Sequence, residues 1–103
     1  MSANHSYWVY MMSNKTRSTL YIGITDNLER RVSQHRAGEI AGFTQQYHCP
    51  HLVYFEHFRD VRSAIASEKQ LKGWRREKKN ALIAKKNPYW NDLAVELFKD
   101  EGE

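Results

Sequence analysis

A carboxylate interrupts the apolar stripe of a helix expected in the second half of the chain. Glu68 lies seven residues after Val61 and three before Leu71, on the same helical face. A charged side chain on an inward face breaks the pattern of a packed helix, and such breaks mark functional sites. Glu68 is therefore a candidate ligand for a hard divalent cation, since Mg²⁺ needs only one or two carboxylates when a phosphate supplies further ligands. The alternative is a structural ion pair with Arg31.

Two basic side chains lie near the apolar stripe of an earlier helix. Arg31 follows Leu28 by three residues, and His35 follows Val32 by three. A guanidinium at the edge of a core costs free energy unless it is paired or kept for an anionic ligand. Arg31 is therefore a candidate phosphate ligand, with a partner carboxylate as the structural alternative. For His35 alone, a hydrogen bond to a backbone carbonyl is the simpler interpretation.

Alternation along two expected strands adds two tyrosines. Tyr10 shares a face of the first strand with Trp8 and Met12, and Tyr21 shares a face of the second with Gly23. A glycine beside a tyrosine leaves a gap that a backbone or a ligand can approach. Tyrosines are also ordinary residues of half-buried sheets, so each one by itself has a structural interpretation.

The positive charge of the chain is concentrated in one segment. The net charge is +4 and the pI is about 9.3. Residues 69–86 hold eight Lys and Arg and one Glu, a net +7, whereas residues 92–103 carry a net −4. A block this dense suits nucleic acid, the commonest polyanion, although a solvated helix face is the alternative. The candidate phosphate contacts are Lys69, Lys72, Arg75, Arg76, Lys78 and Lys79.

Composition excludes several classes of protein. The 103 residues, 41% of them hydrophobic and 27% charged, predict one domain over 1–103, with a core of about 6–95 and an acidic tail at 96–103. The longest apolar run, residues 7–12, is far shorter than the roughly 20 residues that cross a bilayer. Cys49 is the single cysteine, so an internal disulfide is excluded, and His48 and His51 beside it have no second pair to complete a zinc site. We expect a cytoplasmic monomer with no membrane contact.

The elements that must position these residues follow from periodicity and capping. Strands are expected at 7–12, 20–24 and 52–58, the first two forming a hairpin. Helices are expected from a cap at Asp26 to a stop at Gly38, from a cap at Asp60 to Gly73, over 75–86 before Pro88, and over 92–98. Residues 39–49 are expected to be a loop or a short helix. The order β-β-α-β-α-α describes an α/β domain of the α+β type, with a small three-stranded sheet flanked by helices.

These motifs together resemble the GIY-YIG nuclease superfamily, in particular its small stand-alone bacterial branch. The paired-strand signature matches Val9-Tyr10 and, about ten residues later, Tyr21-Ile22-Gly23. The second motif matches the helix at 27–35, and the segments 68–74, 75–79 and 87–93 resemble the bacterial branch. The similarity covers about residues 6–95. One departure is the opening Gly-Ile of the signature, which is Trp8-Val9 here.

The resemblance implies a divalent-metal-dependent phosphodiesterase that cuts DNA, on a three-stranded antiparallel sheet, with Mg²⁺ or Mn²⁺ as cofactor. Carried over by position, the catalytic residues are Tyr10, Tyr21, Arg31, His35 and Glu68, with Glu68 binding the metal and Arg31 stabilising the pentavalent transition state. The general base is Tyr21 or Tyr10, assisted by His35.

A phenol with an ordinary pKa of about 10 is a poor base at neutral pH, so nearby cations must favour its ionised form. An active-site asparagine of some members falls on Asn87 or on Asn80. The alternatives to an autonomous nuclease are a nucleic-acid-binding module without activity and a DNA-repair component that depends on partner proteins.

Overall fold

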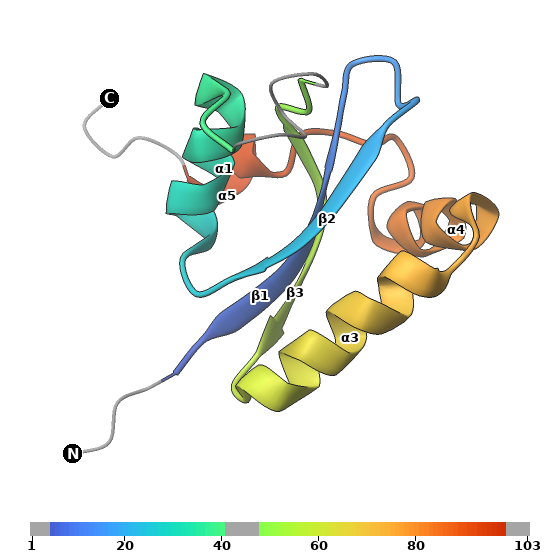
Figure 1. The fold of residues 1–103 in the computed structure, drawn as a ribbon. Helices are drawn as coiled ribbons and strands as arrows, with labels where there is room; N and C mark the ends of the chain where they lie inside the picture. Colours follow the sequence, from blue (N-terminus) through green and yellow to red (C-terminus); the bar gives the residue numbers. More distant parts are fainter. Residues whose placement is uncertain (1–4, 41–47, 99–103) are drawn as a thin grey trace.

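The structure, a computed structural model, describes residues 5–40 and 48–98 of the chain. Its elements confirm the predicted α+β class and order (Figure 1): β1 (Tyr7–Ser13), β2 (Leu20–Thr25), α1 (Leu28–Ala37), β3 (His51–Phe58), α3 (Val61–Gly73), α4 (Arg76–Lys86) and α5 (Ala94–Leu97). Most of the loop or short helix predicted for 39–49 lies outside the described residues, as does the end of the acidic tail. Within the described part, no helix is long and apolar enough to cross a membrane.

The three strands form one antiparallel sheet with β1 at its centre, in the order β2-β1-β3. The register places Tyr10 of β1 opposite Gly23 of β2 and opposite Phe55 of β3. A register shift between Met11 and Met12 skips Val53, and β1 and β3 then continue to pair with Met12 opposite Leu52. The central strand therefore carries Tyr10 between two partners that fix its position.

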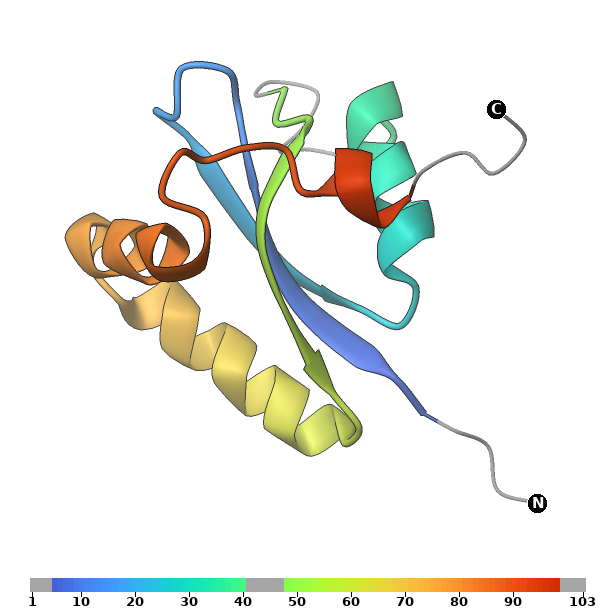
Figure 2. The same cartoon turned by 180° about the vertical axis from the view of Figure 1, so that it is seen from behind.

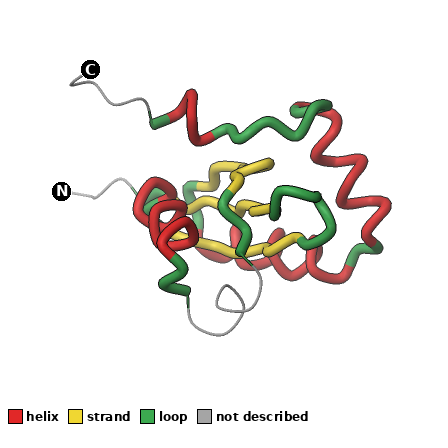
Figure 3. Tube along the Cα trace, turned by 90° about the horizontal axis from the view of Figure 1, so that it is seen from above, coloured by secondary structure: helices red, strands yellow, loops and turns green. Residues whose placement is uncertain are grey.

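Helices cover both faces of the sheet (Figures 1 and 2). On one face, Val9 and Met11 of β1 pack with α3 and α4. On the other, Tyr10 and Met12 pack with α1 and α5. Seen from above, the strands lie between these two layers of helix (Figure 3). The alternation along β1 thus sends successive side chains into two separate cores.

The boundaries of the helices agree with the predictions except at the start of α1 and in α5, which spans only Ala94–Leu97 of the predicted 92–98. The predicted cap, Asp26, is wrong: Asn27 caps the helix, and its side-chain oxygen accepts a hydrogen bond of 3.0 Å from the Arg30 amide. Asp26 instead pairs with the Arg30 side chain at 3.5 Å, on the exposed surface. Gly38 ends α1 with a φ of 73°, the left-handed conformation that favours glycine. Asp60 caps α3 as predicted, accepting from the Ser63 amide.

Helix α3 buries a narrower stripe than its sequence predicts. Val61, expected on the inward stripe, is 39% exposed and Ile65 is 40% exposed, whereas Ala64 and Leu71 are buried. Ala64 and Leu71 are seven residues apart, so they define one line of contact along the helix. At 100° per residue, Glu68 lies about 50° from that line, and Val61 and Ile65 lie further from it. The single line of contact explains why the larger apolar residues reach solvent and puts Glu68 at the margin of the interface.

Candidate active site

A buried tyrosine and a buried histidine form the centre of the site. The Tyr10 hydroxyl lies 3.0 Å from His35 Nε2, and the two side chains are 1% and 0% exposed. Gly23 leaves the space for this hydroxyl, since a Cβ atom there would lie 2.5 Å from it. The gap predicted beside Tyr21 is thus occupied by the Tyr10 side chain instead of a ligand.

Tyr21 connects this buried pair to the surface. Its ring centroid lies 4.6 Å from that of His35, edge-on, and 6.1 Å from that of Tyr10. Tyr21 is half-buried and lines a pocket of about 260 Å³ together with Lys72 of α3 and Lys79 of α4. The accessible tyrosine of the site therefore lies beside two cations of the predicted basic block.

Burial keeps the Tyr10 hydroxyl in its neutral form. Desolvation raises the pKa of Tyr10 far above its ordinary value, and the charge of Tyr21, a side-chain hydrogen bond with Tyr21 and the Glu68 carboxylate raise it further, while Arg31 lowers it. Tyr10 therefore keeps its proton at neutral pH. Among the predicted catalytic residues, Tyr10, Tyr21 and His35 are in contact. Arg31 and Glu68 act on the pKa of Tyr10 through their charges.

His35 is neutral in the folded protein. Burial, and secondarily the positive charge of Arg31, lower the pKa of His35 to about 4. Its Nε2 is used by Tyr10, and its buried Nδ1 has no hydrogen-bond partner among the described residues. The backbone-carbonyl bond expected as the simpler interpretation is thus replaced by a bond to a tyrosine 25 residues away.

The lowered pKa predicts that the protein loses stability as the pH falls. His35 binds a proton near pH 6.5 in the unfolded chain but only near pH 4 in the fold. Its contribution to stability is present above pH 6.5 and is lost between pH 6.5 and 4, amounting to about 2 kcal/mol by pH 5. Urea unfolding of the wild type and of His35→Gln at pH 7.5 and 5.0 measures this loss. A wild-type difference no larger than that of the variant contradicts the prediction.

The Glu68 side chain is largely buried, with 15% of it exposed, and its carboxylate pairs with Lys72 Nζ at 2.8 Å. Within the described residues its ion-pair partner is thus Lys72 and not Arg31, the structural alternative considered above. Sequence reasoning missed this partner, which the i, i+4 spacing would have indicated.

The donor set at Glu68 fits magnesium better than zinc. No group of three His, Cys, Asp or Glu side chains gathers at a common point within residues 5–40 and 48–98. One accessible carboxylate suits a Mg²⁺ ion that takes its other ligands from water and phosphate, once Lys72 has released the carboxylate. His48 is exposed and Cys49 is fully buried, so these neighbours do not form a common site.

Most residues of the basic block face solvent, but Arg76 makes hydrogen bonds within the fold. Arg76 donates to Asn80 Oδ1 at 2.8 Å, to the Ser18 carbonyl at 3.1 Å and to the Arg17 carbonyl. It thereby ties α4 to the β1–β2 hairpin. Lys79 is half-buried in the pocket of Tyr21, and the remaining candidates are exposed: Lys69, Lys72, Arg75 and Lys78.

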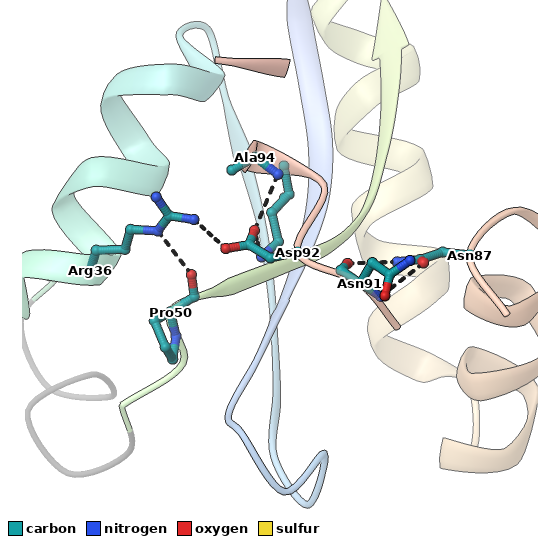
Figure 4. Close-up of polar contacts among 7 residues, drawn as sticks. Arg36, Pro50, Asn87, Asn91, Asp92 and Ala94 are labelled. Carbon is teal, nitrogen blue, oxygen red and sulfur yellow. Dashed lines mark hydrogen bonds and ion pairs between the residues drawn. The ribbon is translucent and has the colours of Figure 1, made fainter. Parts of the chain in front are cut away.

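The predicted asparagines have structural contacts. Asn87 is buried, and its amide donates to the carbonyls of Val53 and Asn91 while its oxygen accepts from the Asn91 amide (Figure 4). Asn80 accepts from Arg76. Asn87 therefore supports the segment after α4, and its predicted match to an active-site asparagine stays a prediction.

Comparisons with known proteins identify the family of this chain. The family model described as the GIY-YIG catalytic domain matches residues 6–81. A UPF0213 protein of Natronomonas pharaonis is 40% identical over 82% of this chain and 95% of its own, and one of Clostridium perfringens is 39% identical over 78% and 85%. The solution structure of the UPF0213 protein of Bacillus halodurans aligns with a TM-score of 0.56 and 26% identity, covering 87% of this chain and 95% of its own. This chain therefore belongs to the GIY-YIG family.

Proposed function

We propose that this chain is a divalent-metal-dependent endonuclease that hydrolyses phosphodiester bonds of DNA, with residues 6–95 as one nuclease domain. The observation that carries the proposal is the hydrogen-bonded Tyr10–His35 pair, with Tyr21 packed against it. The charges of Arg31 and Glu68 act on the pKa of Tyr10 in this pair. A binding module needs no such buried pair behind an accessible tyrosine, and it gains nothing from a carboxylate beside a phosphate. DNA repair is the setting that we propose for this activity.

Tyr21 is the proposed entry point for the proton of the attacking water. Tyr21 is half-buried whereas Tyr10 is fully buried. Tyr21 is hydrogen-bonded to Tyr10, which in turn contacts His35 Nε2. Tyr21 can thus accept a proton from water while its own passes through Tyr10 to the neutral His35. A substrate phosphate bound by Arg31 offsets the positive charge that lowers the basicity of His35.

Charge stabilisation is the task of the other two residues. Arg31 holds the equatorial oxygens of the phosphate as negative charge grows in the transition state. Glu68 would hold a Mg²⁺ ion, which would supply Lewis-acid stabilisation of the growing negative charge. The exposed Lys and Arg of the basic block, residues 69–79, then bind flanking phosphates, which makes affinity fall steeply with salt.

Cleavage of a defined DNA panel tests the proposal. Labelled single-stranded, duplex, flap and branched DNAs are incubated with wild-type protein in Mg²⁺, Mn²⁺ or EDTA. We expect metal-dependent cutting, reduced about a hundredfold or more in Tyr21→Phe because the proton acceptor is lost. Tyr7→Phe, which removes a hydroxyl elsewhere in the sheet, serves as the control and keeps full activity. Binding of every substrate without any cutting contradicts the nuclease and favours the binding module or a partner-dependent component.

A further inference from the structure

A second pocket lies away from the proposed catalytic residues, at the tip of the β1–β2 hairpin. It has a volume of about 330 Å³ and is lined by residues of that hairpin and of the segment that follows α4. Lys15 and Arg17 line it from the hairpin, and Tyr89 and Trp90 line it from the segment. The volume is at the lower end of the range for small-ligand sites, so it suits one nucleotide-sized group.

The pocket combines cations with an accessible aromatic ring. Arg17 donates to the Tyr89 carbonyl at 2.9 Å and lies over the Trp90 ring, 5.7 Å from its centroid. These contacts hold the guanidinium in place while other N–H groups remain to bind an anion. Tyr89 is 75% exposed, the most exposed of the large hydrophobic side chains in the described residues. A bare aromatic ring beside fixed positive charge is the combination that binds unpaired bases and their phosphates.

Both walls of the pocket hold unusual backbone conformations. Arg17 has a φ of 65° and Trp90 a φ of 55°, the positive-φ residues other than glycine in the described part of the chain. Such conformations persist only where surrounding contacts enforce them, and they gather at binding sites. Here they face each other across one pocket, and they lie on segments far apart in sequence.

Polar contacts fix the wall that carries the aromatic residues. Asn87 binds the backbone of Val53 and Asn91, and Asp92 pairs with Arg36 and accepts from the backbone amides of Leu52 and Ala94 (Figure 4). The carboxylate of Asp92 is therefore neutralised by its own partners instead of repelling an anion. The pocket keeps a net positive character from Lys15 and Arg17.

We propose that this pocket binds an unpaired nucleotide of the DNA substrate, with the base stacked on Tyr89 and its phosphate on Arg17 and Lys15. The inference rests on the proposed function for the identity of the nucleic acid. Stacking on a side-chain ring requires a base that has left the duplex, so the pocket selects DNA with single-stranded segments. Arg76, which joins α4 to the hairpin backbone at Arg17 and Ser18, places the pocket next to the basic helix.

Binding measurements in EDTA separate this proposal from catalysis. A duplex with a single-stranded flap and a blunt duplex of equal length are titrated by fluorescence anisotropy, with 2-aminopurine at successive flap positions to report stacking. We expect the wild type to bind the flap DNA more tightly and to quench 2-aminopurine at one position. Tyr89→Ala weakens flap binding about tenfold and abolishes quenching, while Tyr89→Trp restores both. The control is Arg62→Ala, which removes one cation at the opposite end of α3 and leaves both unchanged.

Different outcomes overturn different statements. If Tyr89→Ala binds and quenches like the wild type, the stacking pocket is overturned while the nuclease proposal stands. If Tyr89→Ala weakens blunt duplex as strongly as flap DNA, Tyr89 is a general contact and the selectivity is overturned. If the wild type binds no DNA at any salt concentration, the proposed function fails and this inference fails with it.

Discussion

Glu68→Gln is expected to bind DNA at least as tightly as the wild type and to cut it at least about a thousandfold more slowly. The substitution keeps the size of a side chain that is only 15% exposed but removes the charge that would bind a divalent cation. Loss of a negative charge near bound phosphate favours binding, and release of Lys72 from its ion pair adds a free cation. Single-turnover cleavage in Mg²⁺ and anisotropy in EDTA measure the two effects separately.

Glu77→Gln is the matched control for this change. Glu77 is an exposed carboxylate in the first turn of α4, so its substitution alters net charge equally without touching the proposed site. We expect cleavage by this variant to stay within about twofold of the wild type. Cleavage by Glu68→Gln at a rate close to that of Glu77→Gln would falsify the assignment of Glu68 as the metal ligand.

Gly23→Ala is expected to destabilise the protein by about 2 kcal/mol and to lower Tm by roughly 10 °C. The new Cβ on β2 would lie 2.5 Å from the Tyr10 hydroxyl and 2.7 Å from the Tyr10 ring. Tyr10 belongs to the central strand, β1, and is fully buried. Tyr10 must move, which separates its hydroxyl from His35 and disturbs the proton path of the proposed site. Thermal unfolding and cleavage are measured on the same preparation, and both are expected to fall.

Gly73→Ala provides the comparison. A Cβ atom at this last residue of α3 has no neighbouring atom within 4 Å. The unfolding free energy of the Gly73→Ala variant should therefore stay within about 0.5 kcal/mol of the wild type. A similar loss in the two variants would mean that glycine is required for a reason other than the space for Tyr10. Tyr10→Phe combined with Gly23→Ala should destabilise less than the sum of the single changes, because the nearest clashing atom is gone.

Local sequence patterns predicted most of the helices and strands. The predictions that were wrong concern features that depend on how the elements pack together. The hairpin and the cap at Asp60 depend on neighbouring residues alone, so both can be predicted from the local sequence. Asp26 and Asn27 are both good caps, and only the exact start of α1 selects between them. The exposure of Val61 and Ile65 depends on how narrow the contact between α3 and the three-stranded sheet is. Helical periodicity does not predict the width of that contact.

The site was predicted residue by residue but not as a set of contacts. Helical phase selected Arg31 and Glu68, and strand parity selected Tyr21 and Gly23, before any partner was known. The bond between Tyr10 and His35 joins residues 25 apart, and it follows from the docking of α1 on the sheet. Likewise, the hydrogen bond from Arg76 of α4 to the Ser18 carbonyl of the hairpin joins residues 58 apart. No local sequence pattern predicts such a contact.

The placement of α1 and α3 on opposite faces of the sheet has a consequence for when the protein becomes active. On the proposed assignment, Arg31 and His35 arrive with one helical layer and Glu68 with the other, so neither layer alone holds a complete site. The ribosome synthesises Glu68 after both tyrosines, so on this assignment the site is complete only once α3 has docked on the sheet. Incompletely folded copies that expose the basic segment to nucleic acid would then hold no complete cutting centre.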